Sequence, residues 1–476
     1  MRNTIKNYSY SFECSNKKMK LMKLFYIAFF ICGLTLAGYA QNSQDSTQTA
    51  NADPFKNDPF FSRPVSDFLH KPPQDWVEEK NVRHHVNQIN DSGIDYGGGF
   101  ESGPYNSSIL YGVYPSLPMI HYNRVDGLFL GLKKERMQWY NNDWILGIKG
   151  IQPHGFIGYA TALKNWQYAI GLEKVFGRRR YMMVGWEYHD ATSTDDYWRA
   201  GMTETSLTAL FAGYDFLDYY NTRGYGVYLN LRSAKYFEGG ISYNSDEYTS
   251  LDRHTTYSFF GKKSTYRPNP LIDEGKIQSL YIGGSFNPKK LVLLPHFTFN
   301  ARGLAELGNI DGLDTDFAFN RYMAETQYFI SLEPGTMLKI RLRGGSITGN
   351  APVQRRFELG GIGTMRTTPY KFYTGNEMLL SNIEMHFGTE RQNDSDWIDF
   401  DDFTFSVFLD SGWTYDSDKL RNSNDPFSGF SAFDFKDVEH DIGMGIGSSF
   451  IRLELAWHLN NLDQKPALWI RLNPTF

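Results

Sequence analysis

The sequence predicts an all-β fold, a transmembrane antiparallel β-barrel of about sixteen strands, from three observations. The last segment alternates, with Leu468, Ile470, Leu472 and Phe476 on one face, and the chain closes on an aromatic residue. Aromatic residues make up 16% of the chain, which suits the two interfacial girdles of a barrel. The mean hydropathy of -0.46 is too low for a helical membrane protein, but it fits strands on which every second residue faces water.

The terminal strand by itself leaves one alternative open, because an edge strand of a soluble β-sandwich has the same two-residue period. In the barrel interpretation the apolar face meets lipid, while the face of Trp469 and Arg471 lines the lumen. The terminal Phe476 is then the expected assembly signal. We accordingly expect the bacterial outer membrane as the location and its lipid as a partner.

Residues 1–40 have the layout of a cleavable secretory signal. Lysines precede an apolar run from Leu24 to Ala40, and small residues end this run. A retained membrane anchor is the alternative. The two cysteines, Cys14 and Cys32, both lie in this segment, so the exported protein is expected to carry no disulfide and no thiol chemistry.

Residues 41–118 are predicted to form a disordered linker and a short periplasmic segment. The first part, 41–75, is rich in Asn, Asp, Ser, Gln and Pro. The barrel is expected over residues 119–476. The formal net charge is -5 and no large basic block is present, which argues against nucleic acid as a partner.

Alternating segments separated by turn residues follow from about Asn123 onward, and many approach the roughly ten residues that cross a bilayer at a tilt. The candidate strands are Gly127–Met137, Trp144–Ile151, Phe156–Ala162, Gln167–Val175, Tyr181–His189, Gly224–Ser233, Phe237–Tyr248, Ile277–Phe286, Val292–Gly303, Phe319–Leu332, Thr336–Gly345, Met378–Phe387, Phe403–Trp413, Asp441–Ser448, Ile451–His458 and Ala467–Phe476.

The connections show the asymmetry of a bacterial barrel, which has short periplasmic turns, long outer loops and an even number of strands. Counting back from a periplasmic C-terminus puts the acidic stretch 388–402 on the periplasmic side, where it is unusually long. The weakest boundary is a hairpin at Gln152–Gly155, which we keep because merging its strands would leave an odd number. The long outer links are 190–223, 249–276, 304–318, 346–377 and 414–440.

Two carboxylates are expected to share the lumen. Glu384 alternates with apolar residues on Met378–Phe387, and Asp410 does so on Phe403–Trp413. A charge that faces hydrocarbon is costly, so both side chains should point away from lipid. Because the two strands are neighbours, the carboxylates should lie close together, and a guanidinium between them would relieve their repulsion.

The most specific stretch of the chain is the loop that precedes Glu384. It holds a glycine-rich run, then Arg366, then a glycine directly before the strand. The loop glycines are Gly360, Gly361, Gly363 and Gly375. This pattern resembles the sixth loop and following strand of the bacterial surface-antigen superfamily, the BamA- and TamA-type barrels.

Other stretches extend the resemblance from about Tyr122 to the end of the chain. Phe408–Gly412 is similar to the aspartate–glycine strand of the family, and Ile451–Trp457 is similar to its penultimate strand. Tyr122–Gly127 and Arg267–Pro270 resemble members from Bacteroidetes. Two departures are expected from this comparison with the family: Thr367 and Thr368 follow the arginine in place of glycine and an aromatic residue, and residues 1–118 are not expected to hold the POTRA domains of most members.

The resemblance implies that the sixth loop folds inward and that Arg366 is held between Glu384 and Asp410. Its glycines would let the backbone turn tightly against the inner wall. An exposed glycine-rich loop with a solvated arginine is the alternative. The implied function is assembly or translocation of outer-membrane proteins through a weak seam between the first and last strands.

The sequence carries no strong catalytic pattern, since it has no His-Glu-x-x-His, no cysteine cluster and no Gly-x-Ser-x-Gly elbow. We therefore expect no enzyme activity, no cofactor and no metal site. A passive porin-like channel and a lipid-handling barrel stay open as alternatives. The expected partners are client outer-membrane proteins, a partner lipoprotein or a second copy of the chain in a homodimer.

Overall fold

A computed structural model describes most of the predicted barrel. The described residues are 119–134, 144–145, 148–149, 151–176, 182–233, 236–261, 266–287, 293–294, 296–333, 335–388, 404–417, 425–447 and 451–472. The predicted signal and linker, 1–118, and the terminal Phe476 lie outside them. All strands belong to one compact unit, Pro54–His458 with Asp463–Phe476, and the described part of the other unit is Leu459–Leu462.

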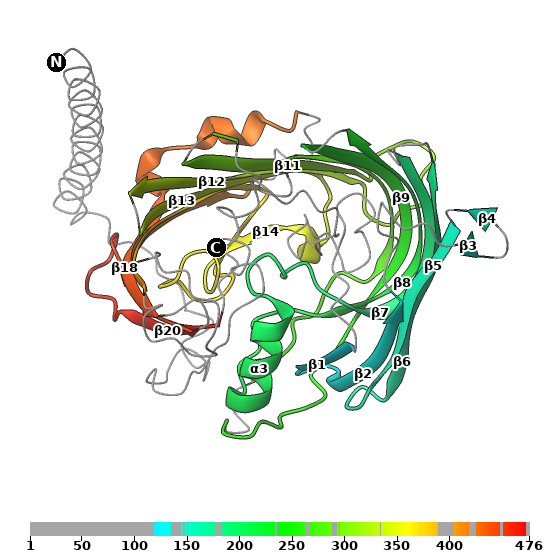
Figure 1. The fold of residues 1–476 in the computed structure, drawn as a ribbon, viewed down its shortest axis with the longest axis horizontal. Helices are drawn as coiled ribbons and strands as arrows, with labels where there is room; N and C mark the ends of the chain where they lie inside the picture. The colour runs from blue at the N-terminus through cyan, green and yellow to red at the C-terminus, as the bar shows by residue number, and fades with distance from the viewer. Residues whose placement is uncertain are drawn as a thin grey trace, which may run out of the picture. The chain divides into compact units, whose positions relative to one another are not determined.

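The predicted fold class is confirmed, because sixteen strands form a single antiparallel sheet in which each strand pairs with the next one along the chain. The sheet curls around a central space (Figure 1). Its strands, in order, are β1 (Met119–Asn123), β2 (Gly127–Lys134), β5 (Ile151–Ala160), β6 (Asn165–Phe176), β7 (Met182–Ser193), β8 (Tyr220–Ser233), β9 (Phe237–Ser250), β10 (Gly275–Phe286), β11 (Phe297–Leu307), β12 (Phe319–Glu333), β13 (Thr336–Gly349), β16 (Glu377–Phe387), β17 (Thr404–Tyr415), β18 (Glu439–Gly447), β19 (Arg452–His458) and β20 (Ala467–Arg471).

The strand number is right, but one predicted strand and one predicted turn are wrong, and several boundaries shift by a few residues; β11, for example, begins at Phe297. The segment predicted as a strand at Trp144–Ile151 forms instead a small separate hairpin of β3 (Trp144–Ile145) and β4 (Ile148–Lys149). No turn occurs at Gln152–Gly155, because β5 runs through it with Pro153 paired to Leu172. The missing strand is β1, which is only five residues long and too short to show its period.

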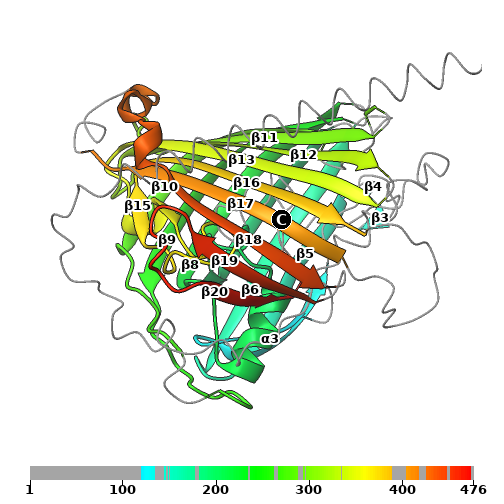
Figure 2. The same cartoon turned by 90° about the vertical axis from the view of Figure 1, so that its left-hand side faces the viewer.

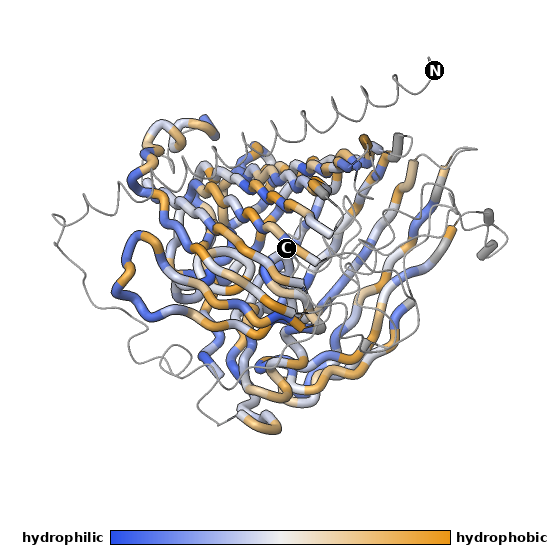
Figure 3. Tube along the Cα trace, turned by 60° about the vertical axis from the view of Figure 1, so that its left-hand side comes forward, coloured by the Kyte–Doolittle hydropathy of each residue, from blue (hydrophilic) through white to orange (hydrophobic). Residues whose placement is uncertain are grey.

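The two faces of the sheet differ as predicted. On β18, Ile442, Met444 and Ile446 are exposed on the convex side, while Asp441 is buried on the other. The same alternation colours the strands in stripes (Figure 3). No helix among the described residues is long and apolar enough to cross a membrane.

Two residues expected on the apolar outer face are covered. Trp413 is 4% exposed, because the outer loop 425–438 packs Phe430 and Phe433 against its ring. Leu472 is also 4% exposed; it directly follows the last residue of β20, and its backbone N–H donates to the Glu204 carboxylate. The two-residue period of a strand therefore predicts on which face a side chain lies, but it does not predict whether another segment covers that side chain.

The connections carry short elements of their own. The β7–β8 loop, predicted only as a long link, contains a helix, α3 (Met202–Ala212). The loop from β13 to β16, which we call loop 6, runs over 350–376 on the concave side of the sheet (Figure 1). β15 lies at one end of the sheet and the β3–β4 hairpin at the other (Figure 2). The remaining short elements are η2 (Val353–Arg355), β14 (Phe357–Leu359), β15 (Tyr373–Gly375), η4 (Ser428–Ala432) and η5 (Phe435–Asp437).

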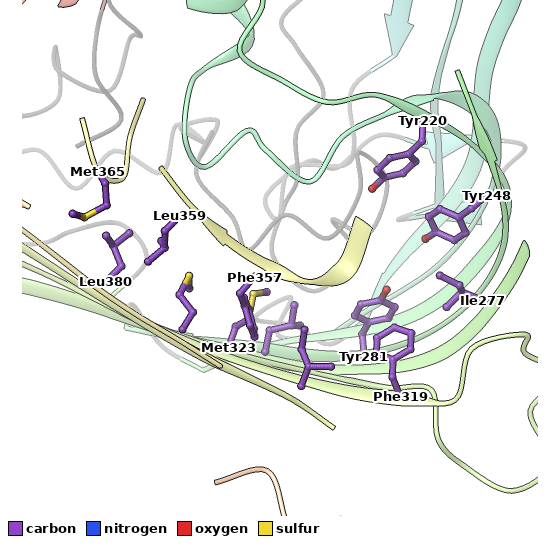
Figure 4. Close-up of a cluster of buried hydrophobic side chains, with 13 residues drawn as sticks. Tyr220, Tyr248, Ile277, Tyr281, Phe319, Met323, Phe357, Leu359, Met365 and Leu380 are labelled. Atoms are coloured by element: carbon purple, nitrogen blue, oxygen red, sulfur yellow. The ribbon is translucent and has the colours of Figure 1, made fainter. Parts of the chain in front are cut away.

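An apolar cluster attaches loop 6 to the sheet. Phe357, Leu359 and Met365 of the loop pack against wall residues that include Met323 and Leu380 (Figure 4). All five side chains are less than 5% exposed. Burial of such side chains contributes on the order of 1.5–3 kcal/mol each, so loop 6 is part of the core rather than a surface excursion.

Candidate functional site: the docked loop 6

The glycines of loop 6 permit a tight path along the inner wall. Gly360, Gly361 and Gly363 have φ angles of 120°, 80° and 74°, a region that other residues rarely adopt. A Cβ on Gly363 would lie 2.4 Å from the carbonyl oxygen of Arg199. Gly375 lets the loop backbone approach β17 closely, since a Cβ there would lie 2.6 Å from the carbonyl oxygen of Tyr415.

This path delivers Arg366 to three carboxylates on the inner wall. Its guanidinium contacts Glu384 of β16, Asp410 of β17 at 3.5 Å and Glu454 of β19 at 3.2 Å. Its guanidinium carbon also lies 3.7 Å from the centroid of the Phe408 ring. The side chain of Arg366 is 4% exposed and the three carboxylates are fully buried.

Charge balance at this cluster depends on a second arginine. Arg452 of β19 donates to Glu384 at 3.0 Å and also contacts Glu454. His386 adds a further contact to Glu384 at 2.9 Å. Buried carboxylates are stabilised when they are paired, and here each of the three carboxylates contacts at least one of the two guanidiniums. Burial lowers the pKa of a guanidinium, but Asp410, Glu454 and Glu384 raise the pKa of Arg366 above its ordinary value.

Asp410 is joined to the loop backbone through an amide bridge. Asn382 donates to Asp410 at 2.7 Å and to the carbonyl oxygen of Thr364 at 3.1 Å. Arg341 donates in turn to the Asn382 side chain at 3.0 Å and to the carbonyl oxygen of Gly363. The carbonyls of the tight turn therefore find donors on the wall, as buried backbone groups must.

The residues beside Arg366 extend the attachment to the last strands. The Thr367 N–H donates to Asp441 of β18 at 2.8 Å, and its hydroxyl donates to the same carboxylate. The Trp469 indole of β20 donates to the Arg366 carbonyl oxygen at 2.8 Å. Thr367, which departs from the family pattern, thus supplies a hydrogen-bond donor that glycine lacks. Loop 6 is held by five consecutive strands of the sheet, β16 to β20.

The sequence-predicted residues Arg366, Glu384 and Asp410 come together in the structure, and Phe476 lies outside the described residues. Sequence reasoning missed Glu454 and Arg452 as further members of the cluster. Their signal was present, because Arg452, Glu454 and Ala456 alternate with the outward residues of β19.

A second polar cluster, at the end of the sheet that carries the β1–β2 turn, links loop 6 to the first strands. Arg124, in the β1–β2 turn, contacts Asp215 at 3.2 Å, Asp218 at 3.0 Å and Asn269 at 2.9 Å. Lys371 of loop 6 contacts the same Asp218 at 2.9 Å. The two short motifs that the sequence singled out around Arg124 and Asn269 are therefore neighbours in space.

Over the described part of the chain, no group of three or more His, Cys, Asp and Glu side chains is placed to hold a metal ion. The carboxylates of the Arg366 cluster are occupied by guanidiniums instead. Their arrangement attaches loop 6 to the inner wall.

Among solved structures, the chain is similar to BamA from Haemophilus ducreyi lacking POTRA domains 1-3, at 12% identity over 74% of this chain and 67% of that chain, with a TM-score of 0.45. It is similar to CdiB from Acinetobacter baumannii and from Escherichia coli, both at 12% identity and a TM-score of 0.38. These two matches cover 74% and 75% of this chain but only 57% and 62% of those chains. No family model and no curated protein matches the chain.

Proposed function

We propose that this chain is an outer-membrane barrel that assembles outer-membrane proteins or translocates protein, together with a partner protein or a second copy of itself. The observation that carries the proposal is the docking of loop 6 by Arg366 beside an unpaired seam. The side chains that point outward are mostly apolar and those that point inward are mostly polar, as expected for a barrel in lipid. A loop attached to both flanks of a seam suits a barrel whose edge strands separate there while the flanks stay aligned.

The seam lies between the first and last strands. Among the described residues no hydrogen-bonded register joins β1 to β20, whereas every other neighbouring pair has one. Unpaired strand edges are templates for pairing with another chain. A client strand could therefore add to either edge without disrupting the remaining fifteen ladders.

Loop 6 is attached on both sides of this seam. The Arg366 cluster fixes it to β16 through β20, and Lys371 links it through Asp218 to the β1–β2 turn. The loop would keep the two flanks in register while their edges are free. A diffusion channel needs a constriction, but it does not need this attachment to both flanks.

Assembly can be measured in vesicles that contain the purified full chain. A urea-unfolded outer-membrane barrel protein is added, and its folded fraction is read from heat-modifiable migration on gels. We expect this chain to accelerate client folding and the Arg366→Ala variant to lose most of the acceleration. Full client folding without the chain, or equal activity of the variant, would overturn the proposal.

Single-channel conductance distinguishes the passive channel. A porin-like protein would conduct steadily, with little change on Arg366→Ala unless the loop moves. We expect low conductance for the parent and larger, fluctuating openings for the variant, because the released loop no longer fills the lumen. Steady high conductance of the parent together with no effect on client folding would favour the channel.

The proposed barrel also predicts which loops face the outside of the cell. An epitope tag at His254, which is exposed on the β9–β10 loop, should bind antibody on intact cells. A tag at His296, exposed on the opposite side at the β10–β11 link, should bind only after the outer membrane is opened. Thr194 is a poor site for a tag, because it is fully buried.

A further inference from the structure

Helix α3 occupies the gap at the seam. It belongs to the β7–β8 connection but lies between β1 and β20, away from β7 and β8 (Figure 1). Its residues contact both edges: Tyr122 of β1 packs with Ala209, and Arg471 of β20 pairs with Glu204. A helix keeps its hydrogen bonds within itself, so α3 covers these edges without extending the ladder.

The contact with β20 depends on one carboxylate. Glu204 accepts from Arg471 Nε at 2.9 Å and from the Leu472 backbone N–H at 3.2 Å. Glu204 is the single charged residue of the helix, and both it and Arg471 are 1% exposed. The helix thus places its one charge on the last strand and caps an N–H that a neighbouring strand would otherwise take.

The contact with β1 is apolar, and it is more extensive than the contact with β20. Ala209 is fully buried beside Tyr122 and Tyr266, and the Tyr266 hydroxyl donates to the Ala209 carbonyl oxygen at 2.5 Å. The Tyr122 hydroxyl donates to the carbonyl oxygen of Tyr257 at 2.7 Å. No charge pair holds α3 to β1 among the contacts of the described residues.

The opposite face of α3 is apolar and open. Phe211 is 38% exposed, and Phe259 and Phe260, which stack on it, are 57% and 82% exposed. Both backbone N–H groups of that pair donate to α3 carbonyls at 2.9 Å. The helix and this segment form one apolar outer surface, which suits a piece of wall that meets lipid.

Both ends of the helix have glycine. Gly201 precedes it, and Gly213 follows it with a φ of 76°. Glycine adopts such angles without steric cost, and it also permits other angles readily. The helix is therefore bounded at each end by a residue that can change its backbone angles.

We propose that α3 is a removable cap on the seam, latched by the Glu204–Arg471 pair. The helix occupies the place between β1 and β20. When the helix moves away, an incoming strand of a client outer-membrane protein takes that place. This inference rests on the proposed function only for the identity of that client. The capping itself is a property of this chain and can be measured without any client.

A cysteine at Ala209 reports on the cap. Cys14 and Cys32, the two native cysteines, are replaced by serine, and the folded full chain in vesicles is treated with a water-soluble maleimide. The parent should label slowly, because Ala209 is fully buried. Glu204→Arg and Arg471→Glu should each label about tenfold faster or more, since each puts two like charges at the latch.

The charge-swapped double variant tests the pair itself. Combining Glu204→Arg with Arg471→Glu should return labelling to within about twofold of the parent, because the pair is restored with reversed sign. Lys276→Glu is the matched control, since it breaks an exposed ion pair with Asp314 at 2.7 Å on the β10 side of the sheet. Heat-modifiable migration shows that each variant is folded, and Glu204→Gln serves where a reversed charge prevents folding.

Adding a client protein to the labelling assay separates the proposed cap from the proposed function. An unfolded outer-membrane barrel protein should accelerate labelling in the parent, and an unfolded soluble protein should not. If folded single variants label no faster than the parent, or if the parent labels at once, the cap is wrong whatever the client assay shows. If the variants label faster but no client folds, the cap stands and the proposed function fails.

Discussion

The Arg366 cluster and the Glu204–Arg471 pair both attach a loop to the curled sheet through buried charges, but they differ in redundancy. Arg366 contacts three carboxylates on three strands, and Arg452 shares two of them. Glu204 contacts one arginine and one backbone N–H. The first attachment is spread over five charged side chains, whereas the charged part of the second is a single ion pair.

The difference indicates what each attachment is for. A buried charge with several partners leaves other charges unpaired when it is removed, so it fixes a loop permanently. A single pair at an edge can break and re-form with little rearrangement. We therefore regard loop 6 as a fixed part of the wall and α3 as the movable part of the seam.

The largest expected effect is that of Arg366→Ala. Removing it leaves three buried carboxylates with one guanidinium, and the cost is on the order of 3–5 kcal/mol for a fully buried site. The barrel should stay folded while loop 6 detaches, so the unfolding temperature falls and trypsin cuts at Lys371. Arg366→Lys should recover only part of the loss, since an ammonium cannot fork between carboxylates.

Arg356→Ala in the same loop is the matched control. Arg356 pairs with Asp416 at 3.2 Å, with side chains that are 23% and 38% exposed. Such a surface pair contributes about 0–1 kcal/mol, so trypsin sensitivity at Lys371 should not change. An equal loss in both variants would mean that loop 6 is held by its charge as a whole and not by the cluster.

A smaller effect is expected at the tight turn. Gly363→Ala requires a φ of 74° and brings its Cβ to 2.4 Å from a backbone oxygen. Gly312→Ala needs a similar angle, 95°, but meets nothing within 4 Å. Both variants carry a left-handed cost of about 1–2 kcal/mol, and thermal unfolding should show a clear excess loss for Gly363→Ala. Equal losses would show that the wall does not confine the loop there.

Asp410→Asn should cost less than Arg366→Ala. Asp410 lies 3.5 Å from Arg366, the longest of the three contacts, and Asn382 supplies it with a hydrogen bond at 2.7 Å. The remaining carboxylates still pair with both arginines, so a loss of about 1–3 kcal/mol is expected from the disturbed hydrogen bond. A loss as large as that of Arg366→Ala in chemical unfolding would make Asp410 the principal partner.

The smallest change in stability is expected for Glu204→Gln. Glutamine retains an acceptor for the Leu472 N–H and loses only the charge pair with Arg471. The unfolding temperature should fall less than in Arg366→Ala, while α3 should open more often in the Ala209 labelling assay. A large fall in stability without faster labelling would mean that α3 is a fixed element like loop 6.

The sequence predicted the curled sheet and the inward Glu384 and Asp410, because a two-residue period places alternate side chains on one face. The position of Arg366 between them was implied by the resemblance of its loop to the surface-antigen family. The two-residue period did not predict the strand where it was short, and it did not predict exposure where a loop covered the strand. β1 offers five residues, and loop 425–438 covers Trp413.

Helix α3 was not predicted for a different reason. Its sequence, MTETSLTALFA, gathers most of its polar residues in the first half and its apolar residues in the second, so it has no amphipathic pattern. Its position depends on the distant Arg471 and Tyr122, which are brought near it only by the curvature of the whole sheet.

A double-mutant cycle between Arg366 and Glu384 decides whether these side chains hold loop 6 in place. The free energy of loop release, from trypsin cleavage at Lys371, is measured for the parent, Arg366→Ala, Glu384→Ala and the double variant. Residues in one network show a coupling of about 0.5–3 kcal/mol, and we predict that the double variant is little worse than Arg366→Ala alone. Simple addition of the two losses would contradict the docking of loop 6 through this pair.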